Sequence, residues 1–377
     1  MRKFIHLLMI LLIIIPLVLL AGCWGPKEVT VSVLVQESGP NSPPHSKWIW
    51  NVVSLAADEW NSEPMNKIKI KLDKVEHPST PEGIKNTYNN VIKEKKPVAI
   101  LGSPYSNVVF TLMEDIAESK IPYLTAATNE KITKSGNKAV FRVVTHDKTA
   151  CKIAIKYVVN VLEKKKLAVL YTDNVFGQGA KDSIVEVASE MGGRVVKSLP
   201  YKPGGDKVDV RNQIEELKET DAEFLLIWPD VGEGVPILAQ IKEKQYTIPF
   251  MVRNGILNLY ADNLFSEIHN DSYLSLDFFR TAENMEWVVK VETKYGKDHV
   301  HFIPAAYYDG ANILFNAIKS VSGKITPNSV REQLRKITYS GVLGDYRFDE
   351  NGDSLKSSFI VQIKEERPEL VKIEISE

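Results

Sequence analysis

The sequence lacks the features that mark several large classes of protein. It has only two cysteines among 377 residues, and it contains no G-x-S-x-G, H-E-x-x-H or Walker glycine motif. No familiar nucleophile, zinc or nucleotide site is therefore predicted, and we do not expect an enzyme. Charge is also close to balanced: without residues 1–22, which hold Arg2, Lys3 and no acid, the net charge is −3. Such a balance gives no electrostatic footprint for nucleic acid.

The one long apolar run stands at the N-terminus. Arg2 and Lys3 precede residues 7–20, which are apolar and interrupted by Pro16. This run is shorter than the roughly 20 residues that a spanning helix needs, so it predicts a signal peptide over residues 1–22. The Leu-Ala-Gly-Cys sequence that ends at Cys23 resembles the bacterial lipoprotein cleavage box, which implies lipidation of Cys23 and a tether over residues 23–28. The alternative is an uncleaved signal anchor in which the cysteine stands by coincidence.

Three weaker patterns point to cofactors or metals, and each lacks a required residue. The Gly177-Gln178-Gly179 sequence has Asp182 where a dinucleotide motif needs its third glycine. The acids of residues 349–353 imitate the start of a calcium loop without its glycine and glutamate. His299 and His301 have no third ligand nearby in the sequence. We therefore expect no cofactor and no metal site.

The stretch of residues 97–133 organises the rest of the chain. An apolar run at 98–101 breaks into a turn at Gly102 and Pro104, and apolar residues at helical spacing follow. A second short strand at 121–124 opens into a small polar loop at 125–129. Open α/β sheets bind ligands beyond the carboxyl ends of their strands, where free N–H groups and helix N-termini collect. These two strand ends therefore predict a ligand crevice.

The remaining pattern alternates between strands and helices in two consecutive sets. The first set covers residues 30–144, with a breaker-rich loop expected at 36–47 and a helix from 48. The second set runs from about 147 to 252, and further helices follow at 283–295, 305–321 and 328–337. Residues 346–375 look antiparallel, with Asn351-Gly352 as a hairpin signal. Two sets of strand–helix units indicate two doubly wound sheets.

These residues resemble a known family, the type I periplasmic solute-binding proteins of branched-chain amino acid ABC transporters. The resemblance covers residues 29 to about 364, and it is carried by the order and spacing of several short sequences. They are residues 99–103 with Ser106, residues 121–133, Phe141-Arg142, residues 167–179, residues 306–310 and residues 344–353.

The resemblance implies an α/β fold of two doubly wound lobes, which are joined by three crossing segments and enclose a ligand cleft. We expect the crossings near residues 143–148, 276–280 and 337–343. The first lobe would then hold residues 29–145 plus 278–337, and the second would hold residues 146–277 plus 338–377.

The family also implies the residues of the site. A ligand carboxylate would be held on the first lobe by Ser106, the backbone at Ala126, and Thr128. This agrees with the residues themselves, because a hydroxyl and free N–H groups at a helix start suit a carboxylate. The plainer alternative is that Ser106 caps its helix and Thr128 belongs to an ordinary turn.

The second lobe would contribute one position after each of three strands, namely Phe176, Trp228 and Asn254. Many family members carry an acid near the last position, where it pairs with the ligand's ammonium. Asn254 brings no charge, so either Asp230 or Asp173 substitutes for the acid, or the ligand is not an α-amino acid. Tyr105 and Trp48 are candidates for an aromatic wall, although such a tryptophan is more often part of a core.

The family resemblance therefore implies a monomeric extracytoplasmic lipoprotein that is anchored to the cell membrane. It would capture an amino acid or a related carboxylate by lobe closure and deliver it to an ABC permease. The alternative is a ligand sensor of the same fold that docks on a receptor.

Overall fold

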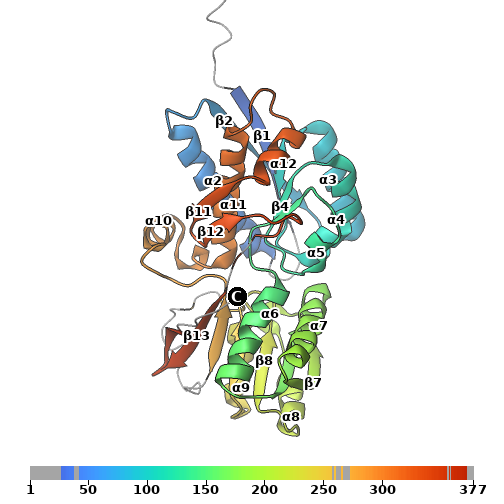
Figure 1. Cartoon of the computed structure of the whole chain (residues 1–377), viewed down its shortest axis with the longest axis vertical. Helices are drawn as coiled ribbons and strands as arrows, with labels where there is room; N and C mark the ends of the chain where they lie inside the picture. Colours follow the sequence, from blue (N-terminus) through green and yellow to red (C-terminus); the bar gives the residue numbers. More distant parts are fainter. Residues whose placement is uncertain are drawn as a thin grey trace, which may run out of the picture.

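The structure is a computed structural model that describes residues 27–37, 42–256, 259, 265, 272–354, 356 and 358–371. The expected signal peptide and Cys23 lie outside the described residues. The described chain forms two α/β lobes that lie one above the other (Figure 1). This confirms the predicted fold class of two α/β lobes.

The first lobe is built on a parallel sheet in the order β2-β1-β3-β4-β5. Alternate residues of β1 face opposite ways, so that Val31 and Val33 enter one core while Leu34 enters another. Its strands are β1 (Lys27–Gln36), β2 (Ile68–His77), β3 (Ala99–Leu101), β4 (Tyr123–Thr125) and β5 (Val140–Arg142).

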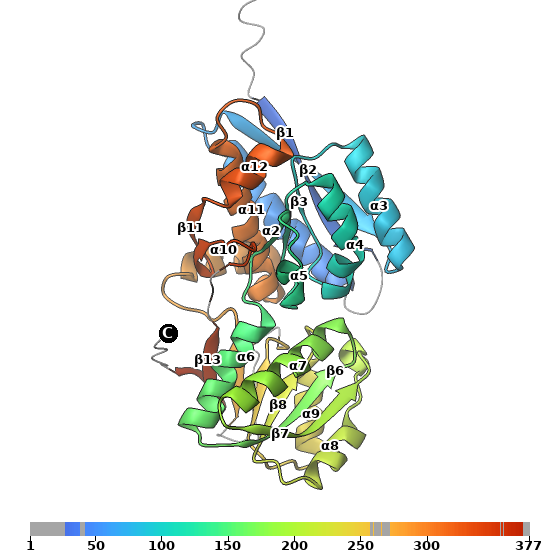
Figure 2. The ribbon, with the colours of Figure 1, turned by 45° about the vertical axis from the view of Figure 1, so that its right-hand side comes forward.

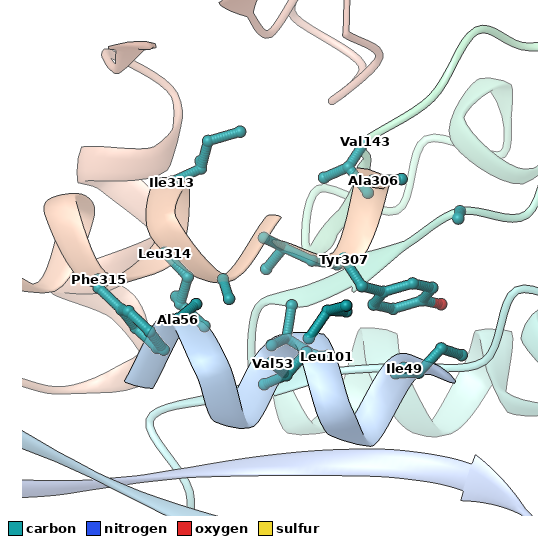
Figure 3. Close-up of a cluster of buried hydrophobic side chains, with 14 of the residues drawn as sticks. Ile49, Val53, Ala56, Leu101, Val143, Ala306, Tyr307, Ile313, Leu314 and Phe315 are labelled. Atoms are coloured by element: carbon teal, nitrogen blue, oxygen red, sulfur yellow. The ribbon is translucent and has the colours of Figure 1, made fainter. Parts of the chain in front are cut away.

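Helices cover both faces of this sheet (Figure 2). Those on one face are α3 (Pro81–Glu94) and α4 (Ser106–Ser119), and the other face is covered by α2 (Ser42–Ser62) and α11 (Phe302–Lys319). In Figure 3, Ala56 of α2 lies close to Leu314 and Phe315 of α11, and Val53 lies close to Leu101. The lobe also contains α5 (Lys131–Lys134), α10 (Met285–Tyr295), a 3₁₀ turn (Lys297–His299) and α12 (Pro327–Leu334).

The second lobe is built on a sheet in the order β14-β13-β10-β9-β8-β6-β7. β13 and β14 run antiparallel, and the strands from β10 to β7 pair in parallel. Its strands are β6 (Lys166–Thr172), β7 (Arg194–Tyr201), β8 (Phe224–Trp228), β9 (Phe250–Arg253), β10 (Tyr273–Leu276), β13 (Phe359–Lys364) and β14 (Arg367–Val371). Its helices are α6 (Asp147–Lys156), continued by a π turn (Tyr157–Val161), α7 (Val175–Glu190), a 3₁₀ turn (Gly205–Lys207), α8 (Arg211–Lys218) and α9 (Gly234–Glu243).

Three connections pass between the lobes, and hydrogen bonds join them to one another. The first follows β5, the second follows β10, and the third precedes β13. Ser354 of the third connection donates to the carbonyl oxygen of Val144 in the first, at 3.1 Å. Ser358 donates to the carboxylate of Asp277 in the second, at 2.8 Å. The connections therefore form one hydrogen-bonded hinge region.

Two elements differ from the sequence expectation. Residues 338–377 were expected in the second lobe, but β11 (Thr338–Gly341) and β12 (Gly344–Arg347) pair as a hairpin, and Tyr346 and Phe348 belong to the core of the first lobe. The third connection therefore comes later, after Phe348 rather than at residues 337–343. In addition, α2 begins at Ser42, within the segment expected to be a loop. Prolines are tolerated in the first turn of a helix because the N–H groups of that turn have no partner within the helix.

Candidate ligand-binding cleft

A cavity of about 410 Å³ lies between the two lobes and takes its walls from both. Its size is within the range of small-molecule sites in proteins. The residues that line it and that matter below are His45, Tyr105, Ser106, Ala126, Thr128, Asp147, Asn174, Val175, Phe176, Asp230, Arg253, Asn254, Phe302 and Ile303. Six of the eight residues expected at the site thus line one cavity, namely Tyr105, Ser106, Ala126, Thr128, Phe176 and Asn254.

The wall of the first lobe combines a helix N-terminus with a polar loop. α4 begins at Ser106, whose hydroxyl accepts a hydrogen bond from the N–H of Asn129 at 3.4 Å. The N–H of Ala126 interacts with the hydroxyl of Tyr307, whereas within the described residues no hydrogen bond involves the N–H of Thr128. A helix N-terminus and a free N–H group favour an anion, so this wall suits a carboxylate.

A buried arginine holds this loop from behind. Arg142 has no exposed surface, and its guanidinium donates to the carbonyl oxygens of Ala127 and Asn129. It also pairs with the carboxylate of Asp353 at 2.6 Å and donates to the hydroxyl of Thr133 at 2.9 Å. Because Arg142 binds these carbonyl oxygens behind the loop, the N–H of Thr128 remains for the cleft.

The wall of the second lobe carries a buried acid that the sequence did not single out. Asp147 opens α6, is 1% exposed, and lines the cavity. One of its oxygens, Oδ1, accepts a hydrogen bond from the indole of Trp228 at 3.2 Å. Burial raises the pKa of Asp147 to about 6, against the opposing effects of Arg253 and the Trp228 hydrogen bond. An acid in a first helical turn directly after a crossing segment is the signal that could have identified it.

A second acid, Asp230, follows β8 by two residues. Its Oδ2 atom accepts hydrogen bonds from Asn174 at 2.9 Å and from Thr172 at 3.4 Å. Burial and the nearby Glu233 raise the pKa of Asp230 to about 7. Of the two acids proposed to substitute at position 254, Asp230 lines the cavity, whereas Asp173 is exposed and is bonded by Gln178.

Asn254 lines the cavity, but its amide is engaged by the hinge. Its Nδ2 donates to the carboxylate of Asp277 at 2.9 Å, and its Oδ1 accepts from the N–H of Asp277 at 2.9 Å. The same carboxylate pairs with Arg253 at 2.6 Å, and both of these charged side chains are buried. Asp277 does not line the cavity, so Asn254 is held by an acid behind the cleft wall that also pairs with Arg253.

The two tryptophans lie behind the cleft walls and do not line the cavity. Trp228 is 1% exposed and contacts the site through Asp147. Trp48 is 4% exposed, donates to Asp298 at 3.2 Å, and packs on His45 with ring centroids 5.1 Å apart. His45 does line the cavity and shares a hydrogen bond of 2.6 Å with the hydroxyl of Tyr105. Both tryptophans therefore position residues of the walls.

Two further observations concern metal binding and membrane spans. Within the described ranges, no cluster of three or more histidine, cysteine or acidic side chains is arranged to hold a metal ion. No helix in the part of the chain that the structure describes has the length and apolar character needed to cross a membrane.

Comparison with known proteins places the fold and the site in context. A family model described as periplasmic binding protein matches residues 28–368. An amino acid binding protein from Pseudomonas aeruginosa is 25% identical over 342 residues, which cover 89% of each chain. The Leu/Ile/Val/Thr-binding protein of Salmonella typhimurium is 21% identical and covers 89% of this chain and 93% of its own.

Solved structures show the same arrangement of two lobes. A leucine binding protein from Thermotoga maritima has a TM-score of 0.77 at 21% identity, and the match covers 91% of this chain and 98% of that one. A solute binding protein of an ABC transporter from Rhodopseudomonas palustris, in complex with 3,4-dihydroxy benzoic acid, has a TM-score of 0.79 at 18% identity, with 93% and 96% covered. The chain described here belongs to the periplasmic binding protein family and has the type I fold.

Proposed function

We propose that this protein captures a small amino-acid-like solute outside the cytoplasm and delivers it to the permease of an ABC transporter. The observation that carries the proposal is the polarity of the cleft. The first lobe presents the N-terminus of α4, Ser106 and the loop at Thr128, and the second presents the carboxylates of Asp147 and Asp230. An anionic and a cationic end of one ligand would be satisfied by opposite walls.

The backbone also sets the spacing between the two ends. The N–H of Asp147 donates to the carbonyl oxygen of Thr128 at 2.9 Å, so the buried acid is tied to the carboxylate-binding loop. An α-amino acid carries its ammonium and carboxylate on one carbon atom. This class of ligand therefore requires an acceptor for the ammonium, here Asp147, close to donors for the carboxylate, here the loop at Thr128.

Ligand screening by thermal shift tests the proposal. With the purified full chain, a true ligand at 100 times its dissociation constant should add about 2.7 kcal/mol to the free energy of unfolding. The names of the relatives guide the panel: amino acids come first, and aromatic carboxylates are the alternative. The absence of any shift with amino acids would contradict the proposal.

The carboxylate site is tested by calorimetry on the double variant Ser106→Ala, Thr128→Ala. Charge-assisted hydrogen bonds contribute about 1.5–3 kcal/mol each, so affinity should fall by about tenfold or more. The amide derivative of the same amino acid lacks the carboxylate, so the double substitution should reduce its affinity much less. Full retention of affinity by the double variant would show that the ligand carboxylate does not bind to this wall.

The lipid anchor and the permease partner are parts of the same proposal. Mass spectrometry of membrane-extracted protein should show a chain that begins at an acylated Cys23, and Cys23→Ala should remain unprocessed. Uptake of the ligand into vesicles that contain the cognate permease should require this protein. If the ligand instead altered the output of a receptor and no uptake occurred, the sensor alternative would replace transport.

A further inference from the structure

The cavity holds more negative charge than a zwitterionic ligand needs. Two acids, Asp147 and Asp230, and one arginine, Arg253, line it. The charge of Arg253 is already matched by Asp277, which lies 2.6 Å from it in a buried pair. Two carboxylates therefore remain for the ligand, whereas one ammonium needs only one of them.

Asp147 has one oxygen atom without a hydrogen bond of good geometry, although the side chain of Thr128 is close enough to lower the pKa of this acid. Its Oδ1 is bonded by Trp228, whereas its Oδ2 is buried and accepts no hydrogen bond from the described residues. A buried and unsatisfied carboxylate oxygen costs free energy unless a donor arrives. The tie between the N–H of Asp147 and Thr128 sets this oxygen beside the carboxylate-binding loop.

Asp230 is anchored in a different place and through one oxygen only. The Oδ2 atom of Asp230 accepts both hydrogen bonds that this side chain receives. One comes from Thr172, the last residue of β6, and the other from Asn174, two residues after the strand. The Oδ1 atom of Asp230 accepts none from the residues that the structure describes. Asp147 is bonded instead by Trp228, the last residue of β8. The two open oxygens are therefore fixed by separate strand ends of one wall.

We propose that the cleft is built for an amino acid with a basic side chain, whose α-ammonium binds Asp147 and whose side-chain cation binds Asp230. This inference rests on the proposed function. Asp147 takes the α-ammonium because it is tied to Thr128, next to the carboxylate, and Asp230 is left for the distal cation. Apolar side chains of the lining, such as Val175, Phe176 and Ile303, suit the methylene chain between the two charges.

Calorimetry with a matched pair of ligands tests the inference on the full chain. L-Lysine and L-norleucine have side chains of equal carbon length that differ in the terminal ammonium. We expect L-lysine to bind at least about tenfold more tightly, since a charge-assisted hydrogen bond is worth that factor. Asp230→Asn should remove most of this preference and change the affinity for L-norleucine by less than about threefold. Asp147→Asn should weaken both ligands.

Asp173→Asn is the control, because Asp173 is an exposed acid close to the same strand end. It should change neither affinity, and the melting temperature of each variant reports whether it is folded. L-Norleucine binding that equals or exceeds L-lysine binding would overturn the inference and leave the proposed function standing. An equal loss for both ligands in Asp230→Asn would also overturn it. If neither amino acid bound, the proposed function and the inference would fail together.

Discussion

The side-chain amide of Asn129, on the first lobe, donates a hydrogen bond of 3.0 Å to the carbonyl oxygen of Val175, on the second. Gly179 of α7 makes room for this contact, since a Cβ atom there would lie 2.3 Å from the Asn129 nitrogen. The lobes therefore touch directly beside the cleft. Contacts of this kind favour the closed state independently of the ligand.

Gly179→Ala is expected to weaken ligand binding by disturbing this contact. The methyl group would displace the Asn129 amide, which is the end of a flexible side chain, and would break its hydrogen bond to Val175. A neutral hydrogen bond contributes about 0.5–1.5 kcal/mol, so the dissociation constant should rise roughly 2- to 10-fold. Calorimetry measures this change, and Gln178→Ala, at the neighbouring exposed position, should leave affinity unchanged. Unchanged affinity in Gly179→Ala would show that the contact does not contribute to closure.

Arg142→Met is expected to cost more stability than almost any surface change. It removes a buried cation that is bonded to two loop carbonyls, and it leaves the carboxylate of Asp353 without its partner. Breaking a buried ion pair in this way costs about 3–5 kcal/mol. Urea unfolding measures the loss. Glu76→Gln, in the exposed pair of Lys74 and Glu76, should change stability by at most about 1 kcal/mol.

Asn254→Ala is expected to affect the hinge rather than ligand preference. Asn254 has a φ of 44°, in the left-handed region that asparagine tolerates and alanine disfavours by about 1–2 kcal/mol. The change also removes both hydrogen bonds to Asp277. Asn254→Gly keeps the backbone conformation and loses only the amide, so its unfolding free energy should fall by less than that of Asn254→Ala. A change in the order of ligand preference would instead assign Asn254 to the ligand.

The pH dependence of the ligand-free protein should reveal the buried acids. The pKa of Asp230 rises from its usual 3.8 to about 7 in the folded state, so its contribution to stability is present below pH 4 and is lost as pH rises toward 7. Asp230→Asn removes this loss. The melting temperature of the variant, relative to the native protein, should therefore increase between pH 4 and pH 7. A difference that is independent of pH would show that Asp230 stays ionised throughout.

The affinity for a cationic ligand should increase with pH, whereas the contribution of Asp230 to stability decreases with pH. Binding requires ionised Asp147 and Asp230, whose pKa values are about 6 and about 7. Affinity should therefore rise as pH increases through this range and reach a plateau above it, which calorimetry at several pH values measures. A neutral ligand without an ammonium group serves as the control and should not gain affinity.

Local pattern predicted a crevice at the two strand ends of residues 97–133, and the family resemblance supplied the residues of the first wall. Ser106, Ala126 and Thr128 directly follow short buried strands, and the carboxyl ends of parallel strands share one edge of a sheet. Side-chain direction on the second wall depended on partners far away in the sequence. Asn254 turns to Asp277, and Trp228 turns to Asp147, which precedes it by 81 residues. No periodicity in the sequence carries that information.

The same distinction explains why residues 338–348 were expected in the second lobe. A hydrophobic pattern does not say which of two cores a segment joins. Tyr346 enters the first lobe, where its hydroxyl donates to the carbonyl oxygen of Val143 at 3.2 Å. Asp309 of α11 accepts hydrogen bonds from the N–H groups of Val342 and Leu343, which fixes the turn of the hairpin on that lobe.

The pair of Arg142 and Asp353 also sets an order of events during synthesis. The two residues are 211 positions apart, so Arg142 is made long before its partner. Until Asp353 is made, Arg142 would have to be buried without its anion or stay in water, and the loop at residues 126–129 would lack its support. A nascent chain that already contains the whole first sheet therefore cannot yet present a finished first wall of the cleft.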